Sequence, residues 1–306
     1  MAQGWLAIVN PVSGENKNEK KSEIIIQHLI NSGVKLEVKK TYSKGSAITI
    51  TKEMVEAGYT KLIVIGGDGT LHEVVNGVML QQKVKTNEVK IAMFSLGTGN
   101  DFIRTLNIPK DYSKATQLLL SEKTKTIDAG RVTFFLNGKK QKRFFINVLG
   151  MAFDGAVTER ANSTKGAIGK LTYLKSVLVT LFKYEPTKIK IIVDDKVVAD
   201  ETIYCINIGN CKYSGGGMRL VPDAIPDDGY FDITILKPLS NLVAIANLHR
   251  LFNGTIKKIR QVTAMRGKSI KVYSQPEICA EAEGEFLGWS SFEVEIVPKA
   301  ITIIAP

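Results

Sequence analysis

The order of apolar runs along the chain constrains the fold more than any other feature. Over the first 128 residues, short β-rich runs alternate with longer helix-like segments. This alternation is typical of a parallel sheet with crossover helices. The expected strands are residues 5–9, 34–40, 62–65, 89–94 and 126–129, and the expected helices are residues 17–31, 46–57, 71–80 and 113–120. The pattern predicts an N-terminal α/β domain.

Beyond Gly130 the pattern changes to many strand-like runs separated by turn signals such as Asn137-Gly138 and Asp194-Asp195. Two apolar segments, residues 170–183 and 239–251, interrupt these runs as expected helices. A chain of 306 residues is long enough for two domains. We expect the α/β domain to span residues 1–128 and a mainly β domain to span residues 129–298.

Composition excludes several classes of protein. An apolar fraction of 44% with 23% charged residues is that of an ordinary folded chain. No apolar run approaches the roughly 20 residues that a bilayer-spanning helix needs, and no secretory signal is evident, so the cytoplasm is the expected compartment. Cys205, Cys211 and Cys279 have neither disulfide-framework nor zinc-site spacing, which favours buried thiols.

The net charge of +11 indicates affinity for polyanions: nucleic acid, anionic lipid or nucleotide. The basic residues are scattered in short groups, and no nucleic-acid-binding motif accompanies them. We therefore expect no nucleic-acid partner.

The strongest local signal is the glycine-rich loop Gly66-Gly67-Asp68-Gly69-Thr70, which follows a buried strand and leads into a helix. Such a loop exposes backbone N–H groups beside the positive end of a helix dipole, which suits a phosphate. A tight turn with Thr70 as helix N-cap explains the same residues equally well. The loop at residues 96–102 is a second turn of this kind, with Asn100 or Asp101 as the cap.

Two chemical motifs are rejected. The helix after the first loop has Asn76 where a zinc-protease helix requires its second histidine. Residues 166–171 contain a Gly-Lys pair, but they lack the loop length and the following Ser or Thr of a Walker A motif.

Several separated segments together resemble the bacterial lipid kinases of the diacylglycerol kinase catalytic-domain type, to which sphingosine and ceramide kinases are related. The resemblance spans nearly the whole chain. The matching segments are Asn10-Pro11-Val12-Ser13-Gly14, Thr41, Gly66 to Thr70 with Asn76-Gly77, Leu96 to Phe102, Phe145 to Asn147 with Gly150 and Phe153-Asp154, Asn207, Gly215 to Met218, Pro222 to Ala224, and Asp228 to Asp232.

The resemblance implies an N-terminal α/β domain of the NAD kinase and phosphofructokinase type, a C-terminal β-sandwich, and an active site in the cleft between them. It also implies that a C-terminal segment, at about residues 299–306, returns to the first domain. It implies transfer of the ATP γ-phosphoryl group to a lipid hydroxyl, with Mg²⁺. The residues that it assigns to ATP are Asn10, Pro11, Val12, Ser13, Gly14, Thr41, Gly66, Gly67, Asp68, Gly69, Thr70, Leu71, His72, Thr98 and Asn100. It also places Asp68 at the phosphates, and Asp228 with the carbonyls of Ile225 and Tyr230 at a structural magnesium site.

The catalytic base is where this chain departs from the family. The family's usual Asp-Gly-Glu aligns with Glu283-Gly284-Glu285, so glutamate stands in the place of aspartate. Glutamate has nearly the same intrinsic pKa as aspartate, so Glu283 or Glu285 is expected to serve as the base. The alternatives are a weakened enzyme and an exposed acidic edge strand, which would explain the cluster of Glu281, Glu283 and Glu285 without any chemistry.

We expect the lipid substrate to be diacylglycerol or a similar alcohol at an anionic membrane surface, with the protein bound peripherally and, as is common in the family, as a homodimer. The apolar segments 171–182 and 242–252 are candidates for the lipid pocket. Two other functions stay open: an NAD kinase, which shares the GGDGT loop, and a nucleotide- or membrane-binding relative without turnover.

Overall fold

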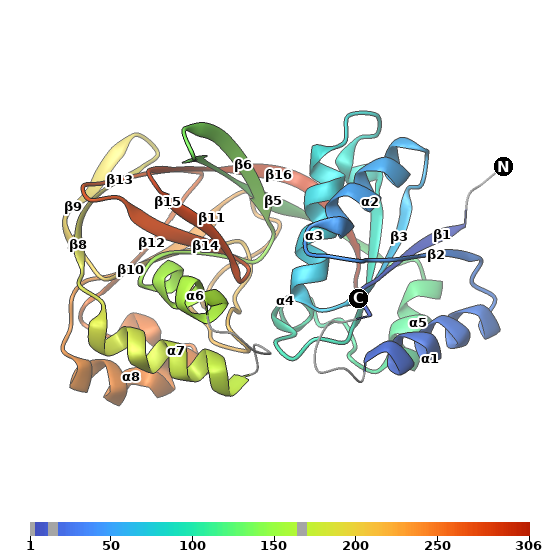
Figure 1. Ribbon diagram of the computed structural model, residues 1–306, viewed down its shortest axis with the longest axis horizontal. Helices are drawn as coiled ribbons and strands as arrows, with labels where there is room; N and C mark the ends of the chain where they lie inside the picture. Colours follow the sequence, from blue (N-terminus) through green and yellow to red (C-terminus); the bar gives the residue numbers. More distant parts are fainter. Residues whose placement is uncertain (1–3, 12–17, 164–169) are drawn as a thin grey trace. The chain divides into compact units, whose positions relative to one another are not determined.

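The computed structural model describes residues 4–11, 18–163 and 170–306, and the chain forms two compact units (Figure 1). Unit 1 comprises Met1–Ala129 together with Pro298–Pro306, and unit 2 comprises Gly130–Val297.

Unit 1 is built on a parallel sheet with the strand order β2-β1-β3-β4-β16. Every residue of β1 is buried, whereas β2, at the edge, is half-exposed. The strands are β1 (Trp5–Val9), β2 (Leu36–Lys40), β3 (Lys61–Gly66), β4 (Lys90–Ser95) and β16 (Phe292–Ile304). β16 joins this sheet through its last residues, where Thr302 and Ile303 pair with Lys90 and Ile91.

Helices cover both faces of this sheet (Figure 1). Alternate strand residues, such as Ala7, Ile63 and Phe94, pack against α1 and α5 in one apolar cluster, as expected for strands buried on two sides. The helices of unit 1 are α1 (Asn18–Asn31), α2 (Ser46–Glu56), α3 (Asp68–Leu80), α4 (Asp101–Thr105) and α5 (Tyr112–Leu120), with a 3₁₀ turn at Thr86–Glu88. The expected parallel α/β architecture is confirmed.

Unit 2 contains two sheets of mainly antiparallel strands that enclose one apolar core. The first sheet has the order β12-β11-β10-β7-β14-β15, and its strands are β7 (Val148–Ala152), β10 (Cys205–Gly209), β11 (Phe231–Leu236), β12 (Val262–Gly267), β14 (Ile278–Ala282) and β15 (Glu285–Ser290). The opposing strands are β5 (Thr124–Leu136), β6 (Lys139–Phe145), β8 (Thr187–Val193), β9 (Lys196–Ile203), β13 (Ser269–Ser274) and the first half of β16. The predicted β-sandwich is confirmed.

Three helices belong to unit 2: α6 (Phe153–Ser163), α7 (Lys170–Lys183) and α8 (Asn241–Asn253). The apolar composition of α7 and α8 predicted both, whereas α6 was not predicted because its sequence lacks a strong apolar face. A 3₁₀ turn follows α8 at Ile256–Lys258. Within the described ranges, no helix combines the length and the hydropathy that crossing a bilayer requires.

Two predicted hairpin turns and the state of the cysteines are confirmed. Asn137 and Gly138 both have positive φ, as do Asp194 and Asp195, which is the geometry of tight two-residue hairpins. The three cysteines are free and buried. The chain leaves β6 at Phe145 and begins β7 at Val148.

Candidate active site

Three loops of unit 1 meet at one edge of the parallel sheet. Val9 lies opposite Ile65, and Gly66 lies opposite Ser95, so β1, β3 and β4 end at the same level. Hydrogen bonds between backbone atoms join the residues at these ends: Asn10 N donates to Ile65 O (3.0 Å), Leu96 N to Gly66 O (2.7 Å), and Thr41 N to Val9 O (2.8 Å). The carboxyl edge of a parallel sheet is where ligands of open α/β folds bind.

The two glycine loops touch because neither has a side chain at the point of contact. A Cβ built on Gly97 would lie 2.9 Å from the Cα of Gly67, closer than real Cβ contacts allow. The second loop therefore lies against the N-terminus of α3, whose N-cap is Gly67. The N–H groups in the first turn of a helix are not used by the helix itself. Together the loops form a backbone surface suited to phosphate oxygens.

Thr70 is not the N-cap, which corrects one of the two interpretations of this loop. α3 begins at Asp68, so Thr70 lies inside the first turn, where its Oγ1 accepts a hydrogen bond from Asn10 Nδ2 (3.1 Å). This bond ties the loop after β1 to the loop after β3. Asn100 does occupy the N-cap position of α4, but its side chain makes no capping bond and instead contacts Ser95 Oγ.

The predicted nucleotide residues differ in how accessible they are. Gly69 and Thr98 are exposed, and Asn10, Pro11, Thr41, Gly67 and Asp68 are half-buried. The side chains of Leu71 and His72 are buried in α3, so only their backbone is available at this edge. Val12, Ser13 and Gly14 lie outside the described residues.

Two carboxylates flank the second glycine loop. Asp68 accepts long hydrogen bonds of 3.4 Å from the backbone N–H groups of Asp101 and Phe102 at the start of α4. A Cβ on Gly99 would lie 2.9 Å from Asp68 Oδ2 and 3.5 Å from Asp101 Oδ2. Carboxylate oxygens are the ligands that Mg²⁺ prefers, so this pair fits a magnesium ion that arrives with nucleotide phosphates. The sequence indicated Asp101 only as a helix cap.

Glu73 holds a neighbouring helix in place. Its carboxylate accepts hydrogen bonds from Gly45 N (2.8 Å) and Ala47 N (3.0 Å) at the start of α2. The N-cap of α2, Gly45, offers no side-chain cap, so Glu73 supplies this function from another helix. Sequence reasoning did not identify this role, because Glu73 and Gly45 are far apart in the chain.

In unit 2, the predicted catalytic glutamates lie on the hairpin between β14 and β15. Glu283 and Gly284 form the turn with φ of 54° and 85°, and Glu285 begins β15. Glycine tolerates this left-handed conformation, whereas a glutamate there is strained unless other contacts hold it. Such contacts are present: Glu283 Oε1 accepts hydrogen bonds of 2.6 Å from both Ile146 N and Asn147 N.

Glu281 is buried beneath the same turn and is not part of an exposed acidic edge, so that explanation of the cluster was wrong for this residue. Its Oε2 accepts a 2.6 Å hydrogen bond from Gly284 N. Burial raises the pKa of Glu281 to about 8, which leaves the carboxyl mainly protonated at neutral pH.

Asp154 of α6 approaches Glu281 across Gly150. A Cβ on Gly150 would lie 2.7 Å from Asp154 Cβ and 2.8 Å from Glu281 Oε1. Burial raises the pKa of Asp154 to about 6, while a hydrogen bond from Cys205 Sγ to Asp154 Oδ2 (3.2 Å) acts in the opposite direction. The β14–β15 hairpin thus rests on two buried acids whose charged forms are disfavoured by burial.

At the predicted structural metal site, Asp228 already has partners. One carboxylate oxygen accepts a hydrogen bond from Tyr230 N (3.1 Å), and the other forms an ion pair with Arg266. Arg266 Nε also lies 3.5 Å from Asp232 Oδ2. Within the described residues there is no group of three or more His, Cys, Asp or Glu side chains arranged to hold a metal. The oxygen donors here have the right chemistry for Mg²⁺, but an arginine neutralises Asp228.

Two family models match the chain. Residues 4–132 match the family described as the diacylglycerol kinase catalytic domain, and residues 147–305 match the YegS C-terminal NAD kinase beta sandwich-like domain. A protein named diacylglycerol kinase from Staphylococcus saprophyticus is 30% identical over 286 residues, which cover 92% of this chain and 88% of the relative. A diacylglycerol kinase from Mycobacterium tuberculosis is 27% identical over 303 residues, covering 98% of this chain and 94% of the relative.

Solved structures show the same fold. A crystal structure of a diacylglycerol kinase from Bacillus anthracis has a TM-score of 0.72 at 23% identity, with 99% of this chain and 97% of that chain covered. Yeast NADH kinase in complex with NADH has a TM-score of 0.57 at 12% identity, with 99% and 83% covered. On the strength of these matches, the chain belongs to the diacylglycerol kinase family of lipid kinases.

Proposed function

We propose that the protein transfers the γ-phosphoryl group of ATP to the hydroxyl group of diacylglycerol or a similar lipid, with Mg²⁺ bound to the nucleotide. Family membership supports the reaction class. The single observation that carries the proposal is the convergence of three loops at the carboxyl edge of β1, β3 and β4, where backbone N–H groups lie beside Asp68.

The residues of unit 1 have distinct parts in this proposal. The loop from Gly66 to Thr70 binds phosphate oxygens through its backbone, with Asn10 to Gly14, Thr41, Leu71, His72, Thr98 and Asn100 around the nucleotide. Asp68, with Asp101 beside it, holds Mg²⁺. When bound, the ion neutralises charge that develops on the transferring phosphoryl group. Unit 1 is accordingly the nucleotide-binding domain and unit 2 the lipid domain.

The acceptor hydroxyl must lose its proton as its oxygen forms a bond to the γ-phosphorus and the bond between that phosphorus and the β–γ bridging oxygen breaks, which releases ADP. We assign the proton to a carboxylate of the β14–β15 hairpin. Because Oε1 of Glu283 already accepts two backbone N–H groups, we assign proton acceptance to Glu285 and positioning of the hairpin to Glu283. Buried Glu281 supports the turn through Gly284 N.

Incubation with labelled ATP and a panel of lipid alcohols tests the proposal. The wild-type protein should label a lipid, and Asp68→Asn and Glu285→Gln should each remove most of the labelling because they remove a metal ligand and the base. Lys139→Gln, on the exposed β5–β6 hairpin, is the matched surface control. Unchanged labelling by Glu285→Gln would refute the assignment of the base, and no labelling of any lipid would refute the function.

Other measurements test the remaining parts of the proposal. We propose that Asp228 and the carbonyls of Ile225 and Tyr230 bind a second, structural Mg²⁺, displacing Arg266 from Asp228. Asp228→Asn should then lower the thermal midpoint in Mg²⁺ but not in EDTA. Peripheral binding to an anionic membrane, a cytoplasmic location and a homodimer stay predictions, which vesicle sedimentation, cell fractionation and light scattering check.

A second function, phosphorylation of NAD, has one observation in its favour, the fold shared with yeast NADH kinase. The same protein preparation should be incubated with ATP and NAD. Formation of NADP without any lipid product would replace the lipid-kinase proposal.

A further inference from the structure

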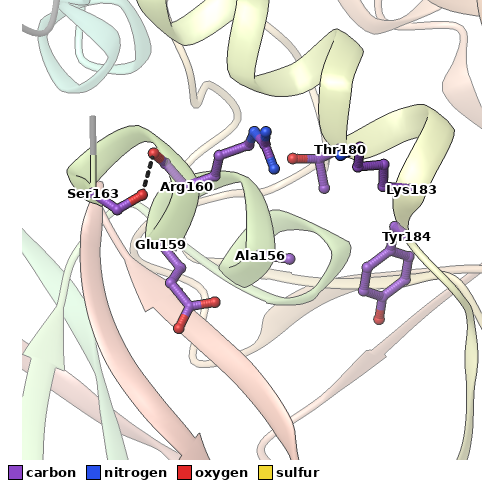
Figure 2. A pocket seen from close by; sticks show the side chains of 7 residues that line it. All are labelled: Ala156, Glu159, Arg160, Ser163, Thr180, Lys183 and Tyr184. Carbon is purple, nitrogen blue, oxygen red and sulfur yellow. Dashed lines mark hydrogen bonds between the residues drawn. The ribbon is translucent and has the colours of Figure 1, made fainter. Parts of the chain in front are cut away.

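A cavity of about 410 Å³ lies between α6 and α7 in unit 2, and its lining contains no residue of the β14–β15 turn that carries the proposed base (Figure 2). Its lining includes two cationic side chains, Arg160 of α6 and Lys183 of α7. Figure 2 shows the guanidinium of Arg160 directed toward Thr180 of α7. Lys183 lies three residues after Thr180, so both are on one face of the helix.

Thr180 provides an independent indication of a ligand. Its side chain is 6% exposed, and in the described part of the chain its Oγ1 has no hydrogen-bond partner. A buried hydroxyl without a partner costs folding free energy and therefore calls for an explanation. Because Thr180 lines the cavity, a bound acceptor atom would satisfy this hydroxyl.

Glu159, the acidic residue of the cavity lining, is hydrogen-bonded to a strand. Glu159 Oε1 accepts a 3.1 Å hydrogen bond from Trp289 Nε1 of β15, and in Figure 2 its carboxylate points away from Arg160 and Thr180. The group that suits two cations and a hydroxyl donor is an anion with several oxygens, such as a phosphate.

The surroundings of the cavity are apolar. The ring of Tyr184, which lines the cavity, packs edge-on against Phe153 and Tyr204. The same apolar cluster contains Leu181 of α7, and Ala244 of α8 packs against it, so both helices contribute to one cluster. Beside this cluster, Phe182 is 63% exposed and Leu242 is 81% exposed, and α8 has no buried residue.

We propose that this cavity binds the phosphate of an anionic glycerophospholipid, while exposed apolar residues of α7 and α8 contact the acyl layer. A diacylglycerol acceptor has no phosphate, so the site is distinct from the acceptor site and anchors the protein to the membrane. The assignment rests on the proposed function only in that the protein must meet a lipid surface. Binding is measured without ATP, so failure of the site and failure of the kinase reaction are distinguishable.

Sedimentation with vesicles of phosphatidylcholine, alone or mixed with phosphatidylglycerol, is the first test. The double variant Arg160→Gln/Lys183→Gln should bind the mixed vesicles about tenfold more weakly than the control Lys139→Gln/Lys140→Gln, which removes the same charge from an exposed hairpin. Labelling of a soluble short-chain diacylglycerol should be the same in both. Equal loss of vesicle binding in the two double variants would show that only general electrostatic attraction to the anionic vesicles is lost, and this result would overturn the proposed site.

Thr180→Val is the second test, and it does not depend on the double variant folding. It replaces an unpartnered hydroxyl with a methyl group, so it should keep or raise the thermal midpoint while it weakens binding to the mixed vesicles severalfold. Unchanged binding would overturn the role of Thr180 and the proposed site. The third test measures binding of inorganic phosphate to the wild-type protein. If the cavity bound free phosphate as tightly as it binds the mixed vesicles, the lipid assignment would be overturned.

Discussion

The substitution Gly77→Ala isolates one close contact between two helices of unit 1. Gly77 lies inside α3, and a Cβ there would be 2.5 Å from Thr51 Cβ and 2.7 Å from Ile48 O, both in α2. Comfortable separations between carbon atoms are about 3.5–4.0 Å, so the added atom overlaps by about 1 Å. Neither neighbour is the tip of a flexible side chain. The helices must therefore move apart.

The expected magnitude follows from two opposing effects. Alanine stabilises a helix interior by about 1 kcal/mol relative to glycine. Overpacking of a dense interface costs about 1–3 kcal/mol and occasionally more, and contact with fixed backbone favours the upper end. We expect a net loss of about 2 kcal/mol in the free energy of unfolding of unit 1, or about 2–4 °C in the thermal midpoint for each kcal/mol.

Gly69→Ala is the matched control in the same helix. Gly69 is exposed, and a Cβ there meets no atom within 4 Å, so the same change should leave the urea midpoint unchanged or raise it. Because Gly69 belongs to the proposed phosphate loop, this variant should instead lose affinity for ATP, measured by calorimetry. A Gly77→Ala protein as stable as the wild type, or two variants with equal losses, would refute the steric reasoning.

Three further predictions concern acidic residues. Glu73→Ala should lower the free energy of unfolding by about 1–2 kcal/mol, because α2 loses its cap; exposed Glu53 of α2 serves as control, and an equal loss on Glu53→Ala in urea titration would contradict this. The raised pKa values of Glu281 (about 8) and Asp154 (about 6) mean that the folded state holds protons which the unfolded state releases. The stabilisation that these two protonated acids contribute is therefore complete below the unfolded pKa values of 4.5 for Glu281 and 3.8 for Asp154. This contribution is lost as pH rises through the folded pKa values of about 6 and then about 8. A urea midpoint that rises between about pH 6 and pH 8 would be inconsistent with burial of both acids. Asp101→Asn should raise the Mg²⁺ concentration needed for half-maximal labelling about tenfold, which is equivalent to about 1.4 kcal/mol; an unchanged requirement would remove Asp101 from the metal site.

The sequence was sufficient to predict that the glycine loops of unit 1 lie at one edge of its parallel sheet, because the signals for these loops are local. Each glycine loop directly follows a buried strand, and parallel strands bring their carboxyl ends to one edge. The same reasoning could not place Asp101 at the proposed metal site, since its approach to Asp68 is a tertiary contact across Gly99. Thr70 was a reasonable cap by residue type, but the helix begins earlier, at Asp68.

In unit 2 the prediction was weaker because burial removes the alternation that identifies strands. All five residues of β7 and of β14 are buried, so neither shows the pattern of a half-exposed strand. Glu281 is among these buried residues, and only the tertiary structure shows that its carboxyl supports the hairpin. The turn itself was harder still to predict, because Glu283 adopts a conformation that glycine or asparagine usually occupies.

The pairing of β16 with β4 also has a consequence for synthesis on the ribosome. Residues 298–306, which cover the β4 edge of the parallel sheet, follow all of unit 2 in the chain. While unit 2 is being translated, the nascent first unit has an unpaired strand edge, which is a template for wrong association. The early folding intermediate should therefore need protection by a chaperone until the last strand emerges, and a stop codon placed before residue 298 should yield insoluble protein.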